Sequence, residues 1–431
     1  MVILSKTLQV ILALSLLIIV HEFGHFIFAK IFRIRVEKFY LFFDVKGKAL
    51  LRFRVGETEF GIGWLPFGGY CKIAGMVDES MDTEQLKREP QPWEFRSHPA
   101  WQRLLVMAGG VLFNFIFAII AYSSILGIWG SAYIPNSQAS IYPNDLALEM
   151  GFKPGDRILA LDDYVPEDFS SLQADLVRKE VNFATVLRGG DTLRLYIDRA
   201  YAPQILNSPL MFDIAMPFVV DSVWTPANSA VLRKGDRIIS IEGVDTPFLQ
   251  DARVLLEEHH GSCVNASVCR EGAVLELPLQ VDSLGKIGIS VGAPPVERQN
   301  YSLLSSIPAG IKMTGETITG YLQDLKMVFK PSTGAYKSVG SFISIGQVFP
   351  KTWDWYRFLS IVALLSIMLG VMNLIPIPGL DGGHILFTLF EIVTGRKPSD
   401  KFLMIMQMIG MALLIMLMIL AFGNDISRLI R

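Results

Sequence analysis

Four long apolar segments constrain the fold of this chain more than any other feature of its sequence. They cover residues 8–32, 104–129, 358–377 and 402–422, and each is long enough to cross a bilayer as a helix, which takes about 20 predominantly apolar residues. Only 19% of the 431 residues are charged, whereas about 25% are charged in soluble domains. We therefore expect a polytopic α-helical membrane protein with four transmembrane helices.

Basic residues predict how these helices are oriented. Lys and Arg are frequent after the first apolar segment, over residues 30–54, and again between the third and fourth segments, over residues 396–401. Loops rich in Lys and Arg are retained in the cytoplasm, so both loops are expected there. No small-residue cleavage site follows the first segment, so it is expected to stay in the mature protein. The amino terminus and the region from about residue 131 to 356 are then expected on the exported side.

Net charge and cysteine content exclude other classes of function. The formal net charge is −2, which provides no basic surface for binding nucleic acid. Cys71, Cys263 and Cys269 are too few for a disulfide framework and lack the spacing of a zinc finger or a redox motif. We interpret all three cysteines as incidental.

The exported region contains an internal repeat. Residues 153–163 and 233–243 share the core Gly-Asp-Arg-Ile, and each copy is followed by an alternating strand pattern, a helical segment and two further strand candidates. Both copies resemble PDZ domains, which bind extended peptides or free carboxyl termini by adding a strand to a sheet edge. The alternative is a pair of small β domains that act only as a spacer.

The first apolar segment contains the motif H-E-x-x-H, formed by His21, Glu22 and His25. On a helix, side chains four residues apart lie one above the other, so both imidazoles can bind one Zn²⁺. Glu22 lies one step round the helix, where it can act as general base toward the attacking water. The alternative is three polar residues satisfied by neighbouring helices, but ionisable groups at membrane depth are costly and usually functional.

A catalytic zinc site needs a third protein ligand, and Asp381 is the strongest candidate. It lies in the sequence N-x-x-P-x-P-x-L-D-G, at residues 373–382. The two prolines are expected to break the third span. A broken helix is tolerated at membrane depth only where its backbone lines a watery cavity or contacts a ligand.

Other polar residues at membrane depth have less specific signals. Asn114 follows Gly109 and Gly110, so we expect close packing of the second span on the first and a hydrogen bond between the two helices. His384 lies outside the motif, and we expect it to cap a helix or lie at the membrane interface rather than bind metal. Together with Gln407, these residues are too few for the polar path of a zinc transporter.

The two motifs together resemble the paired signature of the site-2 protease family of intramembrane zinc metalloproteases. Four spans, with tandem PDZ domains between the second and third, resemble its sigma-E-regulating branch in Gram-negative bacteria. The resemblance implies that His21, His25 and Asp381 bind zinc. It also implies that Glu22 is the catalytic acid and base and that Asn373 hydrogen-bonds the substrate backbone.

The resemblance further implies the substrates and the location. These are single-span membrane proteins already trimmed on the outer side, namely an anti-sigma factor and remnant signal peptides. The chain would lie in a bacterial inner membrane, with the amino terminus and PDZ domains periplasmic and the active site toward the cytoplasmic side. Peptide termini at the PDZ domains and membrane lipid would be the other partners.

A β-hairpin sheet is predicted between the first two spans. Residues 50–55 and 58–62 alternate around a Gly-Glu turn, and the glycine-rich, apolar stretch from Gly61 to Tyr70 follows. Its aromatic residues suit a membrane interface, so we expect the sheet to dip toward the active site. It resembles the membrane-reentrant β-loop of the family, whose edge, here around Gly61 to Tyr70, would pair with an unwound substrate. The alternative is an ordinary surface hairpin.

These expectations give a domain plan. It runs in order: 1–33, first transmembrane helix; 34–103, cytoplasmic-side region with the reentrant loop and an amphipathic segment over 78–103; 104–130, second transmembrane helix; 131–215 and 216–296, PDZ domains; 297–357, mobile linker and interfacial region; 358–390, third transmembrane helix; 391–401, cytoplasmic loop; 402–431, fourth transmembrane helix and tail.

Two functions of different classes remain open at this point. The first is an intramembrane zinc endopeptidase. The second is a non-catalytic membrane scaffold that presents PDZ domains and keeps zinc for structure. The intact Glu22 favours the first, since a structural zinc site needs no general base.

Overall fold

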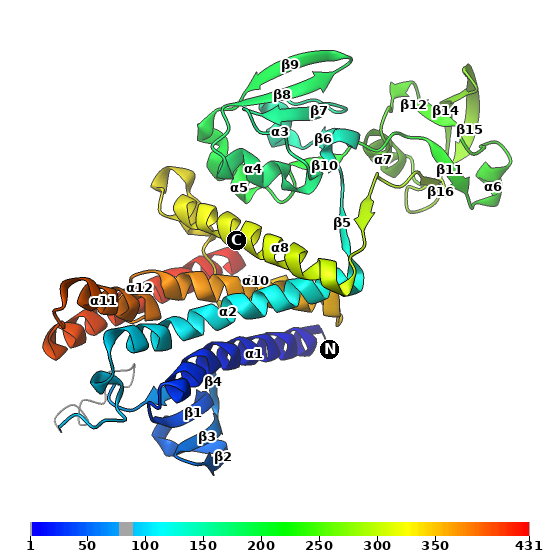
Figure 1. Ribbon diagram of the computed structural model, residues 1–431. Helices are drawn as coiled ribbons and strands as arrows, with labels where there is room; N and C mark the ends of the chain where they lie inside the picture. Colours follow the sequence, from blue (N-terminus) through cyan, green and yellow to red (C-terminus); the bar gives the residue numbers. More distant parts are fainter. Residues whose placement is uncertain (1, 77–88, 431) are drawn as a thin grey trace. The chain divides into compact units, whose positions relative to one another are not determined.

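The chain divides into two compact units in a computed structural model that describes residues 2–76 and 89–430. The first unit contains the chain up to Gly130, Asn300–Phe329, and the chain from Tyr336 onward. The second contains Ser131–Gln299 and Lys330–Ala335 (Figure 1). The two units are described separately.

Four helices of the first unit are long and apolar enough to cross a membrane among the described residues. They are α1 (Val2–Ile31), α2 (Ala100–Trp129), α10 (Trp355–Leu374) and Lys401–Ser427 within α12 (Asp400–Ile430). Each contains most or all of one predicted apolar segment. The prediction of a polytopic helical membrane protein with four spans is confirmed at this level.

The third predicted span is interrupted. Helix α10 ends at Leu374, and α11 (Asp381–Thr394) begins only after the two prolines, so residues 358–390 form two helices with the break that the prolines predicted. A Cβ at Gly382 or Gly383 would overlap backbone atoms of the connecting segment. The segment therefore folds tightly against the first turn of α11, and Asp381 lies in that turn.

Helices α1 and α2 approach closely at glycines. A Cβ at Gly24 would overlap the backbone of Gly109, and a Cβ at Gly110 would overlap the rings of His21 and His25. The predicted close packing of the second span on the first is confirmed. The glycines bring the backbone of α2 against the face of α1 that carries the two histidines.

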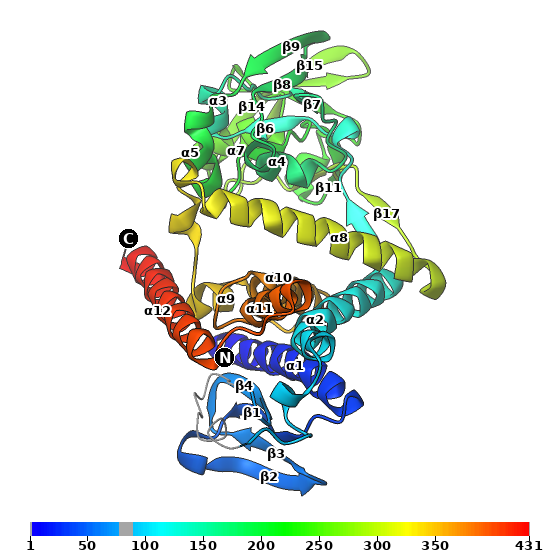
Figure 2. The same cartoon turned by 60° about the vertical axis from the view of Figure 1, so that its left-hand side comes forward.

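A four-stranded sheet lies beside the end of α1 (Figure 2). It contains β1 (Val36–Phe43), β2 (Ala49–Val55), β3 (Thr58–Gly63) and β4 (Leu65–Ile73), in the order β2-β3-β1-β4. The predicted hairpin is β2-β3, whereas β1 pairs in parallel with β3 and antiparallel with β4. Gly61 therefore lies inside the sheet, and the edge expected around Gly61 to Tyr70 is β4. Gly69 of β4 packs against Ile18 of α1.

The region predicted to be a linker over 297–357 contains a long helix. Helix α8 (Leu303–Val328) is capped by Ser302 and packs on α2, where Gly310 contacts Ser123. The remaining elements of this unit are η1 (Val45–Gly47), η3 (Phe95–Ser97), η8 (Ala335–Ser338) and α9 (Phe342–Val348). Residues 78–88 of the predicted amphipathic segment lie outside the described residues.

The second unit contains two similar halves. In the first half, the sheet β7-β8-β9 (Arg157–Leu161, Phe183–Arg188, Asp191–Tyr196) accompanies α4 (Leu172–Arg178). In the second half, the sheet β13-β12-β14-β15 (Val244–Asp245, Arg237–Ile241, Cys263–Arg270, Ala273–Gln280) accompanies α7 (Leu249–Glu258). The other elements are β5 (Ser131–Tyr133), η4 (Asn136–Gln138), β6 (Ile141–Pro143), α3 (Asp145–Glu149), η5 (Phe169–Ser171), η6 (Arg199–Tyr201), α5 (Ala202–Asn207), β10 (Phe212–Ile214), β11 (Val220–Val223), α6 (Pro226–Ser229), β16 (Ile289–Val291), β17 (Glu297–Gln299) and η7 (Pro331–Thr333).

A buried ion pair explains the repeated Gly-Asp in these halves. Asp156 and Asp236 are 0% and 1% exposed. Each accepts two hydrogen bonds of 2.7 Å from an arginine at the end of a later strand, Arg188 or Arg270. The hydrogen bonds from Arg270 lower the pKa of Asp236, so this contribution to stability is present at neutral pH and is lost as the pH falls below about 4.

Replacing Asp236 with Ala is expected to loosen the second half of this unit. The change leaves Arg270 without its carboxylate and removes an acceptor for the Arg233 amide, and breaking one side of a buried pair is strongly destabilising. Hydrogen exchange of the full-length protein should become about 10- to 100-fold faster across β12 and β14. The exposed pair of Asp221 with Lys234 is the control, and Asp221→Ala should change exchange there by less than about fivefold. Equal effects would contradict this account.

Candidate active site

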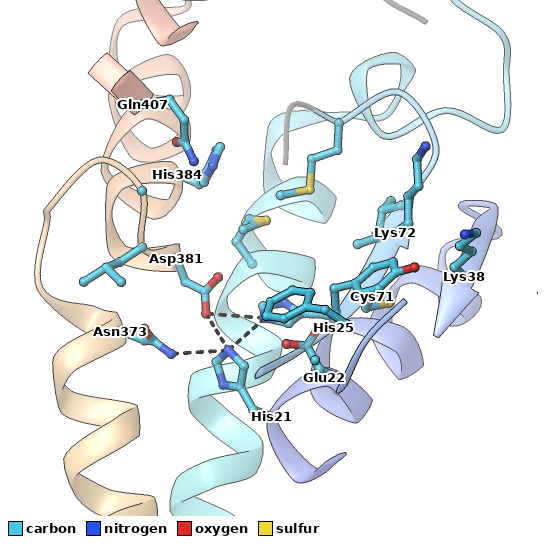
Figure 3. A pocket seen from close by; sticks show the side chains of 18 of the residues that line it. His21, Glu22, His25, Lys38, Cys71, Lys72, Asn373, Asp381, His384 and Gln407 are labelled. Atoms are coloured by element: carbon cyan, nitrogen blue, oxygen red, sulfur yellow. Dashed lines mark hydrogen bonds and ion pairs between the residues drawn. The ribbon is translucent and has the colours of Figure 1, made fainter. Parts of the chain in front are cut away.

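Two helices bring three candidate metal ligands together (Figure 3). His21 and His25 lie one helical turn apart on α1, and Asp381 begins α11. Oδ2 of Asp381 lies 3.2 Å from Nε2 of His21 and 3.3 Å from Nε2 of His25, and the two Nε2 atoms are 3.3 Å apart. The three ligands implied by the sequence therefore converge, although 356 residues separate His25 from Asp381 along the chain.

Hydrogen bonds from α2 orient both imidazoles. Nδ1 of His25 donates to the Val106 carbonyl oxygen at 2.9 Å, so its Nε2 presents a lone pair toward Asp381. Nδ1 of His21 lies 3.1 Å from the side-chain amide of Asn114, whose Oδ1 is buried without a hydrogen bond among the described residues. Rotating that amide by half a turn places Oδ1 against an Nδ1–H of His21, which satisfies both groups.

This arrangement fits a divalent metal. With both histidines protonated at Nδ1, two nitrogen lone pairs and a carboxylate oxygen face one another with no proton between them. Asp381 Oδ2 is accordingly buried without a hydrogen bond to any described residue. A cation relieves this repulsion, and two imidazoles with one carboxylate are a ligand set of catalytic zinc that leaves a further position open. A bound Zn²⁺ would polarise the scissile carbonyl and lower the pKa of water.

A cavity of about 720 Å³ surrounds this cluster. Glu22 and Asn373 line it, and Nδ2 of Asn373 lies 3.3 Å from Nε2 of His21. Strand β4 contributes Leu65 and Gly69 through Ile73. The structure thus brings together all five predicted catalytic, metal-binding and substrate-binding side chains with the edge strand, whereas Gly61 does not reach the cavity.

Asp44, Lys38 and Tyr70 of the sheet region line this cavity and are joined by hydrogen bonds. Asp44 accepts from Nζ of Lys38 at 2.8 Å and from the Tyr70 hydroxyl at 2.7 Å. Burial would raise the pKa of Asp44, but these two hydrogen bonds lower it overall, so the carboxylate stays ionised at neutral pH. Burial and the neighbouring Asp44 raise the pKa of Tyr70, which therefore remains a donor and fixes β4 to the turn after β1.

Three polar residues have places that the sequence did not reveal. Asn114 forms the expected bond between helices, but its partner is His21, a candidate metal ligand. His384 does not cap α11, whose cap position is Leu380. Its side chain lines the cavity, as does Gln407 of α12. The signals were present: His384 lies three residues after Asp381, and Gln407 interrupts an apolar helix.

Asn114→Leu is expected to weaken zinc binding by about 10- to 100-fold, because the partners that orient a metal-binding histidine contribute to affinity on that scale. Competition with a chelator of known affinity, on the purified full-length protein, measures this. Ser124, whose hydroxyl bonds only its own helix, provides the control Ser124→Ala. An unchanged zinc affinity in Asn114→Leu would show that Asn114 only packs the helices.

Comparisons with known proteins agree with this geometry. Residues 9–417 match the family model of Peptidase family M50. The chain is 31% identical to the regulator of sigma-E protease RseP of Escherichia coli over 97% of this chain and 98% of that protein. It is 30% identical, with the same coverage, to the regulator of sigma E protease of Haemophilus influenzae and to a Vibrio cholerae protein provisionally named zinc metalloprotease. The chain therefore belongs to peptidase family M50, the site-2 metalloproteases.

Proposed function

We propose that this protein cleaves single-span membrane proteins within the membrane, after a first cut on their outer side. The observation that carries the proposal is the position of Glu22 beside the three metal-binding side chains, in a cavity bounded by candidate membrane helices and one sheet edge. A general base is needed for hydrolysis and has no purpose in a purely structural zinc site.

The sheet edge supports the handling of a helical substrate. A peptide bond within a transmembrane helix is shielded because its backbone groups are already hydrogen-bonded, so the helix must unwind before cleavage. Strand β4 pairs only with β1 among the described strands, and its other edge can accept the unwound segment as an added strand. The side-chain amide of Asn373 can bind the segment beside the metal ligands.

The chain's own groups then complete the hydrolysis. The carboxylate of Glu22 accepts a proton from the attacking water as the C–O bond forms, and it passes that proton to the amide nitrogen as the C–N bond breaks. The products are a carboxylate and an amine, so no other co-reactant is required.

We infer the substrates and topology from the same resemblance. Two of the three relatives described above carry the name regulator of sigma-E protease, which supports an anti-sigma factor as the main substrate, with remnant signal peptides as a second class. Residues 131–215 and 216–296 would be periplasmic PDZ domains that filter substrates by size or by a newly exposed terminus. The active site would face the cytoplasmic side of a bacterial inner membrane.

The order of cuts is testable with two reporters reconstituted together with the zinc-loaded protein. One is a single-span protein with its outer domain intact, and the other is the same protein trimmed to a short outer tail. The proposal predicts cleavage of the trimmed reporter and little cleavage of the intact one. Equal cleavage of both would contradict the requirement for a prior outer cut.

A further inference from the structure

Gln407 is a buried polar residue to which the reaction above assigns no role. It is 6% exposed, and it is the one polar residue between Lys401 and Asn424 on α12. Its side chain has no hydrogen bond to another described residue, and it lines the active-site cavity. Its amide atoms are not among the fully buried side-chain atoms that lack a partner, so they open onto the cavity, where they can hydrogen-bond a ligand.

The position of Gln407 relative to β4 indicates which ligand. Gln407 and His384 both line the cavity, and Figure 3 shows them on the side of Asp381 away from Cys71 and Lys72 of β4. A segment added to the edge of β4 would therefore have the sheet on one side and Gln407 on the other.

An added strand has backbone groups on both of its edges. Successive residues direct their N–H and C=O groups alternately toward β4 and away from it. The groups toward β4 are satisfied by the sheet. Those directed away lose the partners they had in the substrate helix, and the hydrocarbon core offers none in exchange.

We propose that Gln407 binds the substrate backbone on the edge directed away from β4. Its side-chain amide carries one acceptor and one donor group, which match the N–H and C=O of a single substrate residue. This inference rests on the proposed pairing of substrate with β4. It adds α12 as the second wall of the substrate site.

Single amide-to-ester replacements in a synthetic single-span reporter test this, because an ester removes one backbone N–H and leaves the side chains unchanged. Gln407→Leu should lower kcat/KM for the all-amide reporter by about 100-fold, the effect of two lost hydrogen bonds to buried partners. In the wild-type protein, an ester at one position directed away from β4 removes only the N–H of that pair and should cost about tenfold. In Gln407→Leu that ester should cost nothing more.

Met408→Leu is the matched control, because Met408 is adjacent on α12 and 47% exposed; it should show the wild-type ester profile. If every ester lowers kcat/KM by the same factor in Gln407→Leu as in the wild-type protein, the two losses are independent. Gln407 then has only a structural role, and the inference is overturned. If esters at positions directed toward β4 leave kcat/KM of the wild-type protein unchanged, the substrate does not pair with β4. The inference about Gln407, which rests on that pairing, then fails as well. If esters at β4-facing positions lower kcat/KM but no ester effect changes in Gln407→Leu, the pairing with β4 stands and only the role of Gln407 is overturned.

Discussion

Glu22→Gln is expected to lower the rate of intramembrane cleavage by about two to four orders of magnitude while zinc remains bound. The substitution keeps the size and shape of the side chain but removes the base that accepts a proton from water. His21, His25 and Asp381 are unchanged, and among the described residues they alone form a group that could hold a metal ion. Cleavage of a trimmed reporter and zinc content, measured on the same purified sample, check both parts of this expectation.

Glu316 supplies a matched control for this substitution. It is an exposed residue of α8, paired with Lys312, so Glu316→Gln should leave both cleavage and zinc content near the wild-type values. If Glu22→Gln retains activity, Glu22 is not the general base. If that variant loses zinc, Glu22 is a metal ligand instead.

Gly410→Ala is expected to lower kcat/KM by about 100-fold, although it adds only one methyl group. A Cβ at Gly410 would overlap the carbonyl group of Pro378. Pro378 belongs to the short segment that leads into Asp381. Helix α12 or this segment must therefore move. A displacement of about 1 Å at a catalytic group costs on this scale, and zinc content should fall as well if Asp381 moves.

The same helix provides the control for Gly410. A Cβ at Gly423 would meet nothing within 4 Å, and Ala is intrinsically the better helix former. Gly423→Ala should therefore keep full activity and equal or slightly greater thermal stability. Wild-type activity in Gly410→Ala would mean that α12 does not hold the segment carrying Asp381.

Hydrophobic pattern and motif spacing were sufficient to predict the candidate membrane helices and the pairing of His21 with His25 on one helix face. Each span is recognisable from its own residues, and the break in the third follows from Pro376 and Pro378. His21 and His25 are fixed on one face by the period of the helix. The contact of both with Asp381 depends on how α1 and α11 pack, so the residues alone made Asp381 the strongest candidate for the third ligand, and its assignment as a ligand came from the family resemblance.

Elements whose partners are distant in sequence were predicted less well. The hairpin β2-β3 is local and was predicted. The edge expected around Gly61 to Tyr70 was predicted only in part: it is β4, but Gly61 lies inside the sheet, because β1 inserts between β3 and β4 through pairings that no local pattern reveals. Helix α8 was not predicted, because the residues that favour a mobile linker, Ser332, Gly334, Gly340 and Gly346, lie in the same region but follow the helix.

The roles of polar residues in the spans depended on tertiary contacts. Asn114 and His384 are ordinary polar positions in the sequence, and only the packing of α2 and α11 places the first on a metal-binding histidine and the second in the cavity. Sequence periodicity identifies which residues share a helix face, but not which face of another helix they meet.

The most direct test is to map the bond that the purified, zinc-loaded protein cleaves in a trimmed single-span reporter in liposomes, using mass spectrometry of both fragments. The account predicts a cut within the membrane-spanning segment, in its cytoplasmic half, and no such fragments with Glu22→Gln. A cut outside the membrane segment would contradict it. A reporter that stays intact here, although a related protease cleaves it, would also contradict it. Peptide binding by the second unit would then be the function to test.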